Sequence, residues 1–432
     1  MMWRISPLAV LRVAGAVALG ASSSARADSG VDLFSADTFL LTGDVRALAV
    51  DGERSWVDGA FGKLRFGGRE DGASSNGRLR ASLGSADIVW QPKLGWALSA
   101  TIVGTVQQRD RVEAGLSEAY LGFKPLTNGP IKFSARAGLM WPPVSLEHGG
   151  PEWGLRDTIT PSAINSWIGE EVKFVGAEAT ASVAVGGGKL GLTAALVDAN
   201  DTAGALLAFR GWALHDLKAL AWRKVSLPPL ASGIEPYQPP FTHPLKEMDG
   251  GFLKRPGWYA RAAWQLRAPI KVEVIHFDNG GDPEAVDQYL EWGWRTRFDN
   301  VGVTATLGPA TELRAQAMRG HTVMGFVEEG RRLVDMRFRS AFALITRRFG
   351  DKASLSARGE AFATRNHGSE VTSADDEHGW AVTAAGKRSL RPNLSALVEY
   401  IHIDSRRAGR ERVGLAARQV QNQLQGSLRI RW

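Results

Sequence analysis

The sequence predicts an all-β protein, a transmembrane antiparallel β-barrel of 16 or 18 strands. Three observations predict this class: an export signal at the N-terminus, apolar and polar residues that alternate along most of the chain, and short turns that alternate with longer polar segments. Successive residues of a strand point to opposite faces, so a barrel wall between lipid and water alternates in this way. The predicted barrel covers residues 28–432.

Residues 1–27 have the pattern of a signal peptide. Arg4 supplies the positive start, a mostly apolar stretch follows over 8–19, and Ala25-Arg26-Ala27 forms an A-x-A cleavage site. The apolar stretch is too short to span a bilayer as a helix. The alternatives are an uncleaved anchor and a disordered tail. Cleavage after residue 27 of the 432 would leave 405 residues for export.

Composition excludes several classes of function. The chain has 52 basic and 45 acidic residues, and loss of the three signal arginines lowers its net charge from +7 to +4. This mild charge gives no reason to expect a nucleic acid as partner. After the signal, no run of 18 uncharged apolar residues remains, which excludes transmembrane helices. The absence of cysteine excludes disulfides, thiolate metal sites and a cysteine nucleophile.

Alternation predicts which face of each strand meets lipid. Tryptophan and alanine alternate with arginine, glutamine and tyrosine over residues 258–267, and the segments 292–299, 334–344 and 131–136 repeat the pattern. A soluble antiparallel sandwich also alternates on its wet face and is the alternative fold. The apolar set that we expect to face lipid includes Trp258, Trp264, Trp292, Trp294, Phe298, Phe338 and Phe342.

The opposite set of residues predicts a lumen rich in arginine. Arginine outnumbers lysine 39 to 13, and guanidinium groups bind carboxylate and phosphate through two hydrogen bonds at once. An arginine-lined pore would favour anions. Alternatively, lumen acids such as Glu273 and Glu360 pair with these arginines and leave no selectivity. The predicted pore-lining residues are Arg136, Arg261, Arg267, Arg295, Arg297, Arg314, Arg337, Arg339 and Arg358.

Turn chemistry divides the chain into strands. Glycine, proline and asparagine predict seven short turns, at 91–95, 125–130, 186–189, 267–269, 307–309, 349–352 and 390–393. Long polar segments lie between them, and this order predicts short periplasmic turns and long extracellular loops. About 19 segments can be counted, whereas a bacterial barrel needs an even number. The segments at 38–50, 56–67 and 205–225 are the least certain as strands.

The C-terminal strand resembles the assembly signal of bacterial outer-membrane barrels. Residues 423–432 alternate to the last residue, with Leu428, Ile430 and Trp432 on the apolar face. The family usually ends in phenylalanine, so tryptophan is a minor departure. The resemblance implies a place in the outer membrane of a Gram-negative bacterium, contact with its lipid, and recognition by the outer-membrane assembly machinery.

The segment 142–166 is predicted to be a long loop after an early strand. Large porins fold such a loop into the lumen, and residues 115–185 resemble the phosphate-selective type of porin at the level of the family. That type has a Trp-x-Gly-Glu-Glu strand start, which Trp167-Ile-Gly-Glu-Glu171 matches. The alternative is a solvated extracellular loop. The candidate constriction residues are Glu147, His148, Glu152, Arg156 and Asp157.

A second long loop, 226–256, contains seven prolines and is too poor in backbone donors to be a strand. It could cap the pore, contact a neighbouring subunit or remain a disordered surface loop. No histidine lies in a motif that ties it to a serine, and no nucleotide motif is present. We therefore expect no enzyme, no cofactor and no metal site.

Two hypotheses for function follow. The first is a porin-like channel for passive diffusion of small hydrophilic solutes, with a preference for anions. The alternative is a structural or adhesive barrel, or a barrel enzyme, whose lumen is filled by its own loops. Resemblance to porins implies a homotrimer. The two hypotheses differ in one observable feature, a water-filled lumen.

Overall fold

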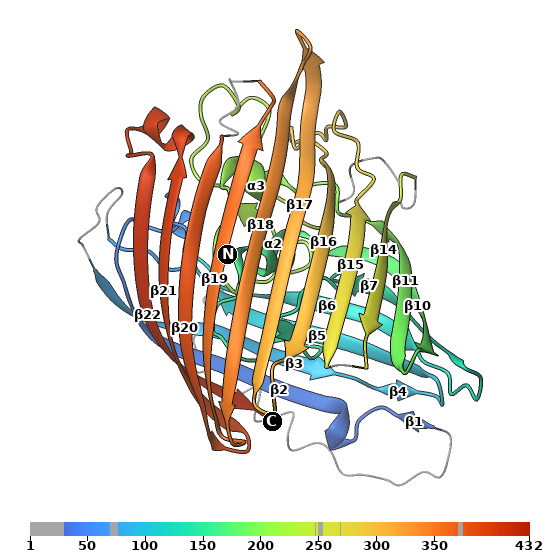
Figure 1. Cartoon of the computed structure of the whole chain (residues 1–432). Coiled ribbons are helices and arrows are strands. Elements are labelled where there is room, and N and C mark those ends of the chain that lie inside the picture. Colours follow the sequence, from blue (N-terminus) through green and yellow to red (C-terminus); the bar gives the residue numbers. More distant parts are fainter. Residues whose placement is uncertain (1–29, 70–76, 247, 249–253, 268, 370–374) are drawn as a thin grey trace.

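The computed structural model describes residues 30–69, 77–246, 248, 254–267, 269–369 and 375–432, and the proposed signal peptide lies outside these ranges. The chain forms a closed antiparallel barrel of 16 strands (Figure 1). The wall strands are β2 (Phe39–Val50), β3 (Arg78–Trp90), β5 (Leu98–Gln108), β6 (Val112–Phe123), β7 (Ile131–Met140), β10 (Phe174–Val185), β11 (Gly188–Asp198), β14 (Gly257–Gln265), β15 (Ile270–Asp278), β16 (Arg295–Thr306), β17 (Thr311–Glu328), β18 (Arg331–Phe349), β19 (Ala353–Asn366), β20 (Glu377–Arg391), β21 (Leu394–Arg407) and β22 (Arg418–Arg431).

Each wall strand pairs with its neighbour along the chain, and β2 pairs with β22 to close the ring. The closing register runs from Thr42 opposite Arg431 to Val50 opposite Gln423. The predicted fold class is therefore confirmed, at the lower of the two strand numbers. Residues 56–67 form no strand, and residues 205–225 form no hairpin but contain the short helix α3 (Ala205–Phe209).

The two ends of the barrel differ as the turn chemistry predicts. All seven predicted short turns join wall strands. The start of β2 and the end of β22 lie at the same end of the barrel as these turns. The opposite end carries the long connections and the tall β17–β18 hairpin (Figure 1). In outer-membrane barrels the short turns are periplasmic and the long loops are extracellular.

Short helices and strands lie at the two ends of the barrel and in its interior. Three-residue and six-residue 3₁₀ helices and two-residue strand pairs accompany one longer helix, α2, which occupies the interior. These elements are β1 (Val31–Asp32), η1 (Ala36–Thr38), η2 (Trp56–Asp58), β4 (Lys93–Leu94), β8 (His148–Gly149), β9 (Gly154–Leu155), α2 (Ala163–Glu171), β12 (Val225–Ser226), β13 (Phe241–Thr242) and η4 (Ala408–Val413). In the part of the chain that the structure describes, no helix is long and apolar enough to cross a membrane.

Aromatic residues divide between the outer face and the interior. Trp258 and Trp264 lie near opposite ends of β14, with 45% and 47% of their surface exposed, as expected for side chains at the two membrane interfaces. Trp294, by contrast, is fully buried. Phe298, Phe338 and Phe342 are also buried. The expectation that these four residues face lipid is wrong.

The core lies inside the barrel rather than between layers. Trp167 of α2 packs edge-on against Phe298 of β16 and Phe338 of β18, with ring centroids 5.7 and 5.1 Å apart. These inward phenylalanines and the helix belong to one buried cluster. An interior filled by protein removes apolar side chains from water, which stabilises the fold as an ordinary core does.

Candidate functional site

Three chain segments fold into the barrel and fill much of its lumen. They connect β2 with β3, β7 with β10, and β11 with β14 (Figure 1). All nine residues of α2 and all five of α3 are buried. Leu64 of the first segment forms a parallel bridge with Leu214 of the third. The segments therefore support one another as well as the wall.

The predicted constriction loop, 142–166, lies inside the lumen and reaches the opposite wall. The backbone N–H groups of Ile159 and Thr160 donate to Glu399 of β21, at 2.6 and 3.0 Å. Asp157 forms an ion pair with Arg314 of β17, and the carbonyl of Leu155 accepts from Arg429 of β22 at 2.8 Å. These contacts come from three wall strands that do not adjoin β7 or β10, so the loop crosses the barrel.

The resemblance to a strand start at residues 167–171 is not realised. These residues form the end of α2, and β10 begins only at Phe174. The side chain of Ser162 caps the helix by accepting from Asn165 N at 3.4 Å, which satisfies a free N–H of its first turn. Because all of α2 is enclosed by the barrel, periodicity on a single face gives little signal for it in the sequence.

Glu147 joins the loop to the wall through a buried ion-pair cluster. Arg358 of β19 donates to Glu147 and to Glu360, both at 2.9 Å, and its side chain is 0% exposed. Arg358 also donates to the carbonyls of Thr160 and Pro161 at 2.8 and 3.0 Å. Burial opposes ionisation of Glu147, but Arg358 and hydrogen bonds hold the pKa of this carboxyl below its usual range.

The other four candidate residues lie apart from this cluster. His148 stacks on Trp153 with ring centroids 3.9 Å apart, and burial lowers the pKa of His148 to about 3, so the ring is neutral. Glu152 forms an ion pair with Arg431 of β22. Arg156 bonds Asp157 at 3.0 Å and is half-exposed. The structure therefore spreads the predicted residues along one loop instead of gathering them around one point.

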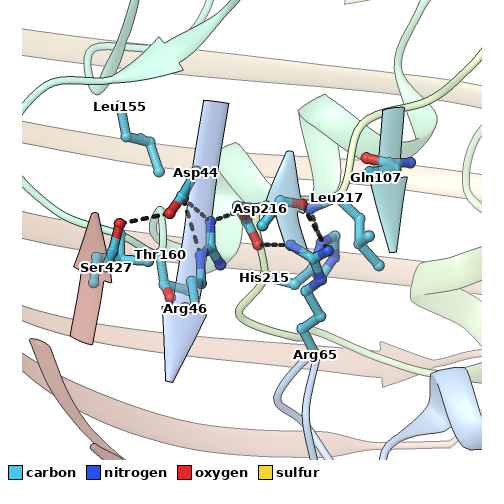
Figure 2. A network of polar contacts seen from close by, with 12 residues as sticks. Asp44, Arg46, Arg65, Gln107, Leu155, Thr160, His215, Asp216, Leu217 and Ser427 are labelled. Carbon is cyan, nitrogen blue, oxygen red and sulfur yellow. Dashed lines mark hydrogen bonds and ion pairs between the residues drawn. The ribbon is translucent and has the colours of Figure 1, made fainter. Parts of the chain in front are cut away.

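Asp216 forms a second ion-pair cluster that the sequence did not reveal. It accepts from Arg46 of β2 at 2.5 Å and from Arg65 of the first inward segment at 2.7 Å (Figure 2). Arg46 also contacts Asp44, which accepts from Ser427 of β22 at 2.5 Å. Burial opposes ionisation of Asp216, yet the two guanidinium groups hold its pKa far below its usual range.

Glu170 of α2 is the centre of a third cluster. Arg109 and Arg210 donate to its two oxygens at 2.7 and 2.5 Å, and Nε2 of His215 lies 2.9 Å away. Burial opposes ionisation, but Arg210, His215 and Arg109 together hold the pKa of Glu170 well below its usual range. These contacts join α2 to the third inward segment and to the end of β5.

Glu171 also links the two helices, but no basic side chain of the described residues lies at hydrogen-bond distance from it. Its oxygens accept from Leu206 N of α3 at 3.0 Å and from Trp167 Nε1 at 2.7 Å. Burial raises the pKa of Glu171 to about 7, although these hydrogen bonds favour the ionised form. The helix pair therefore contains a carboxyl that titrates near neutral pH.

We expect Glu171 to make the protein less stable as pH rises from about 5 to about 7. The unfolded chain loses this proton near pH 4.5 and the folded chain near pH 7, so the unfolded state binds fewer protons in between. The cost by pH 8 is about 3 kcal/mol. Urea unfolding followed by tryptophan fluorescence between pH 4 and pH 8 measures it. The same pH slope in Glu171→Gln would contradict this assignment.

The nine predicted pore-lining arginines divide into two groups. Arg136, Arg261, Arg314 and Arg358 point inward, where each forms an ion pair with a carboxylate. The other five do not line the pore. Arg267 is exposed in the turn between β14 and β15. Arg295, Arg297, Arg337 and Arg339 point outward.

The filled interior is the physical reason for the outward arginines. On β18, Phe338 and Phe342 are buried while the alternate residues Arg337 and Arg339 are exposed. A water-filled lumen would favour the opposite orientation. Because α2 offers an apolar surface inside this barrel, the phenylalanines pack inward and the arginines face out.

A cavity of about 520 Å³ remains at the short-turn end of the lumen. It lies between the loop residues 148–159 and the inner faces of β2, β20 and β22. A second cavity of about 310 Å³ lies beside it, and residues 148–150 and Trp153 line both. The charged residues that line the larger cavity are Asp44, Arg46, Asp87, Glu152, Arg156, Asp216, Lys218, Lys387, Arg429 and Arg431.

Positive charge is in excess in this larger cavity, hereafter the vestibule. Six basic and four acidic side chains line it. Arg46, Lys218 and Arg431 each pair with one of these acids, and Arg156 pairs with Asp157 of the loop. Lys387 instead donates to the carbonyl of Arg156 at 3.0 Å, and Arg429 lies 3.5 Å from Asp44, which already pairs with Arg46. Lys387 and Arg429 therefore supply the unbalanced charge.

The C-terminal residues predicted to form the assembly signal face outward. Leu428 and Ile430 are each 49% exposed on β22, and Trp432 is 71% exposed at the short-turn end. The geometry is compatible with an exposed edge in an unclosed precursor, because β22 pairs with β2 only when the ring closes. Recognition by the assembly machinery stays a prediction.

Comparison with known proteins identifies the fold. No protein-family model and no curated protein matches the chain. Among solved structures, the outer membrane channel DcaP of Acinetobacter baumannii is similar, with a TM-score of 0.56, 11% identity and coverage of 92% of this chain and 99% of that one. The anion-selective porin from Comamonas acidovorans is similar with a TM-score of 0.51 and 9% identity, and the match covers 91% of this chain and 99% of that one. The fold is that of outer-membrane porins.

A porin-type barrel with an apolar outer belt resides in the cell outer membrane. In β18 the outward residues Ala341, Ala343 and Ile345 form this belt, between Arg339 and Arg347. Eight residues of a strand tilted by about 40° rise by about 20 Å, which approaches the height of the apolar band of such barrels. Charged outward residues thus begin where the hydrocarbon ends.

Proposed function

We propose that the chain is an outer-membrane channel for passive diffusion of small hydrophilic solutes, and that it prefers anions. The observation that carries the proposal is the vestibule, where the inward loop and the wall leave a cavity of about 520 Å³ with six basic and four acidic side chains. Fixed positive charge in a narrow passage raises the local concentration of anions.

The ion-pair clusters support this proposal because they hold the inward segments beside the vestibule in place. Asp216 and Glu147 hold the inward segments against β2 and β19 through buried arginines. A loop held in this way presents the same side chains to each passing solute. Most guanidinium charge in the lumen is compensated, so the selectivity depends on Lys387 and Arg429.

The outer surface supports a trimer. In β2, β3, β5, β6 and β7, which the structure describes in full, the outward positions carry no charge over residues 41–49, 79–90, 98–106, 112–123 and 131–139. Leu121 and Phe133, for example, are 51% and 53% exposed. The strands β16–β20 carry outward arginines instead. The uncharged side is the part of the wall that best fits contact with other copies.

Conductance in a planar bilayer tests the proposal. The full-length mature chain, refolded and inserted under a salt gradient, should give discrete steps with a reversal potential on the anion side. Steps that arrive and close in groups of three would support the trimer. Cation selectivity would contradict the preference for anions, and correctly folded protein without conductance would contradict the channel.

A closed barrel is the second candidate, and the filled interior favours it. The fully buried helices α2 and α3 occupy lumen that a wide diffusion pore leaves open. Residues of the Pro-rich loop also pack over α3, where Leu227 and Ile234 join Phe209 in a buried cluster. In a closed barrel these segments would stay in place at all voltages, and the bilayer would show no steps.

A further inference from the structure

The outward arginines of the extracellular half form an ordered patch. Strand register aligns Arg297, His321, Arg337 and Arg365 in one row across β16–β19. The next row toward the membrane contains His276, Asp299, Arg319 and Arg339 on β15–β18. A shallow cavity of about 440 Å³ lies on this outer surface between the rows. We call these eight residues the outer basic patch.

Most of the positive charge in the outer basic patch is uncompensated. Arg297, Arg337, Arg339 and Arg365 are exposed, and none of them pairs with a carboxylate of the described residues. Asp299 is bonded by His276 at 2.8 Å and by Arg319 at 3.4 Å. The other nearby carboxylate, Asp335, contacts His321 at 2.7 Å. Four guanidinium groups therefore remain for a ligand outside the protein.

The level of the patch relative to the apolar belt places it among lipid headgroups. The outward row directly below it is Val301, Ala317, Ala341 and Ala361. The long loops lie above it. Arginine costs little at the membrane interface but several kcal/mol at the midplane. These arginines consequently meet the headgroups of the extracellular leaflet.

We propose that the outer basic patch binds a phosphorylated glycolipid of the extracellular leaflet. Charge complementarity selects this occupant, since guanidinium groups bind phosphate through paired hydrogen bonds. Strands lie about 4.8 Å apart, so Arg297 and Arg337 are separated by about 10 Å and can hold two phosphates on one headgroup. The lipid chains would then lie along the belt below. This inference needs the barrel in its membrane but not a conducting lumen.

Native mass spectrometry of the full-length mature protein in detergent tests the proposal, with bisphosphorylated lipid A as the probe. The variant R297Q/R337Q/R339Q removes three of these four guanidinium groups. The matched control R347Q/R388Q/R391Q removes the same charge from exposed outward positions at the short-turn end. Heat-modifiable migration on gels checks that each barrel is folded.

Each basic residue near an anionic headgroup raises the affinity for it by about a factor of five. The triple variant should therefore bind lipid A on the order of 100-fold more weakly. The control variant should bind as the wild type does. Dephosphorylated lipid A should bind the wild type as weakly as lipid A binds the triple variant. Equal binding by all three proteins would overturn the proposal. Inorganic phosphate that displaces lipid A at similar concentration would also overturn it, by indicating a site for free anions.

Discussion

Replacing Lys387 and Arg429 by glutamate is expected to turn an anion-preferring channel into a cation-preferring one. The vestibule has six basic and four acidic side chains, and K387E/R429E changes this to four and six. Because these are the two cations without a full counter-charge, the substitutions reverse the field and leave the principal ion pairs in place. The ratio of anion to cation permeability should fall by on the order of tenfold.

The reversal potential under a salt gradient measures this change. The control R388E/R391E makes the same change of charge on β20, where Arg388 directly follows Lys387 but points outward. It should keep the selectivity of the wild type. If K387E/R429E kept it as well, solutes would not pass the vestibule. Low salt sharpens the contrast, since screening weakens the field of exposed charges.

The barrel could be predicted from the sequence because lipid imposes a two-residue period on every strand. Turn residues such as those at 307–309 then mark the strand ends, and all seven short turns lie where this chemistry places them. The interior obeys no comparable rule. α2 is enclosed on all sides, so its sequence, including Trp167, shows no polar face that would mark it as a helix.

The same limit explains why the lumen was assigned incorrectly on some strands. Alternation reveals two faces but does not say which of them points inward. On β14 the usual assignment holds, because Arg261 pairs inside with Glu273. On β18 it fails, because Phe338 packs against Trp167. Only the presence of α2 decides between these cases, and its contacts with β16 and β18 join residues more than 100 positions apart in the sequence.

The ion-pair clusters could not be predicted from the sequence either. Asp216 lies in a segment without strand or motif, and its partners Arg46 and Arg65 come from the N-terminal part of the chain. A buried carboxylate of this kind leaves one signal in the sequence, an acid within a mostly apolar stretch such as residues 211–222. That signal indicates a partner but does not identify it.

Arg358→Met is expected to destabilise the barrel more than the loss of any exposed ion pair. The side chain of Arg358 is 0% exposed, and methionine would leave Glu147 and Glu360 facing each other without a cation. Removing one partner of a buried pair typically costs 3–5 kcal/mol. The control Arg418→Met breaks an exposed pair with Asp404 and should cost less than about 1 kcal/mol. Urea unfolding of both variants gives the comparison.

The same variant separates the role of Arg358 in the fold from its role in the lumen. Arg358 makes two of the bonds that hold the loop at Thr160 and Pro161, so R358M should raise the mean conductance and add fluctuations between levels. The triple variant E147Q/R358M/E360Q removes both stranded carboxylates and should recover at least half of the lost stability, because replacing a whole buried cluster costs less than breaking it. The loop would still lack its two bonds to Arg358, so the altered conductance should persist. Recovery of the wild-type conductance together with stability would instead mean that Arg358 acts only by neutralising Glu147 and Glu360.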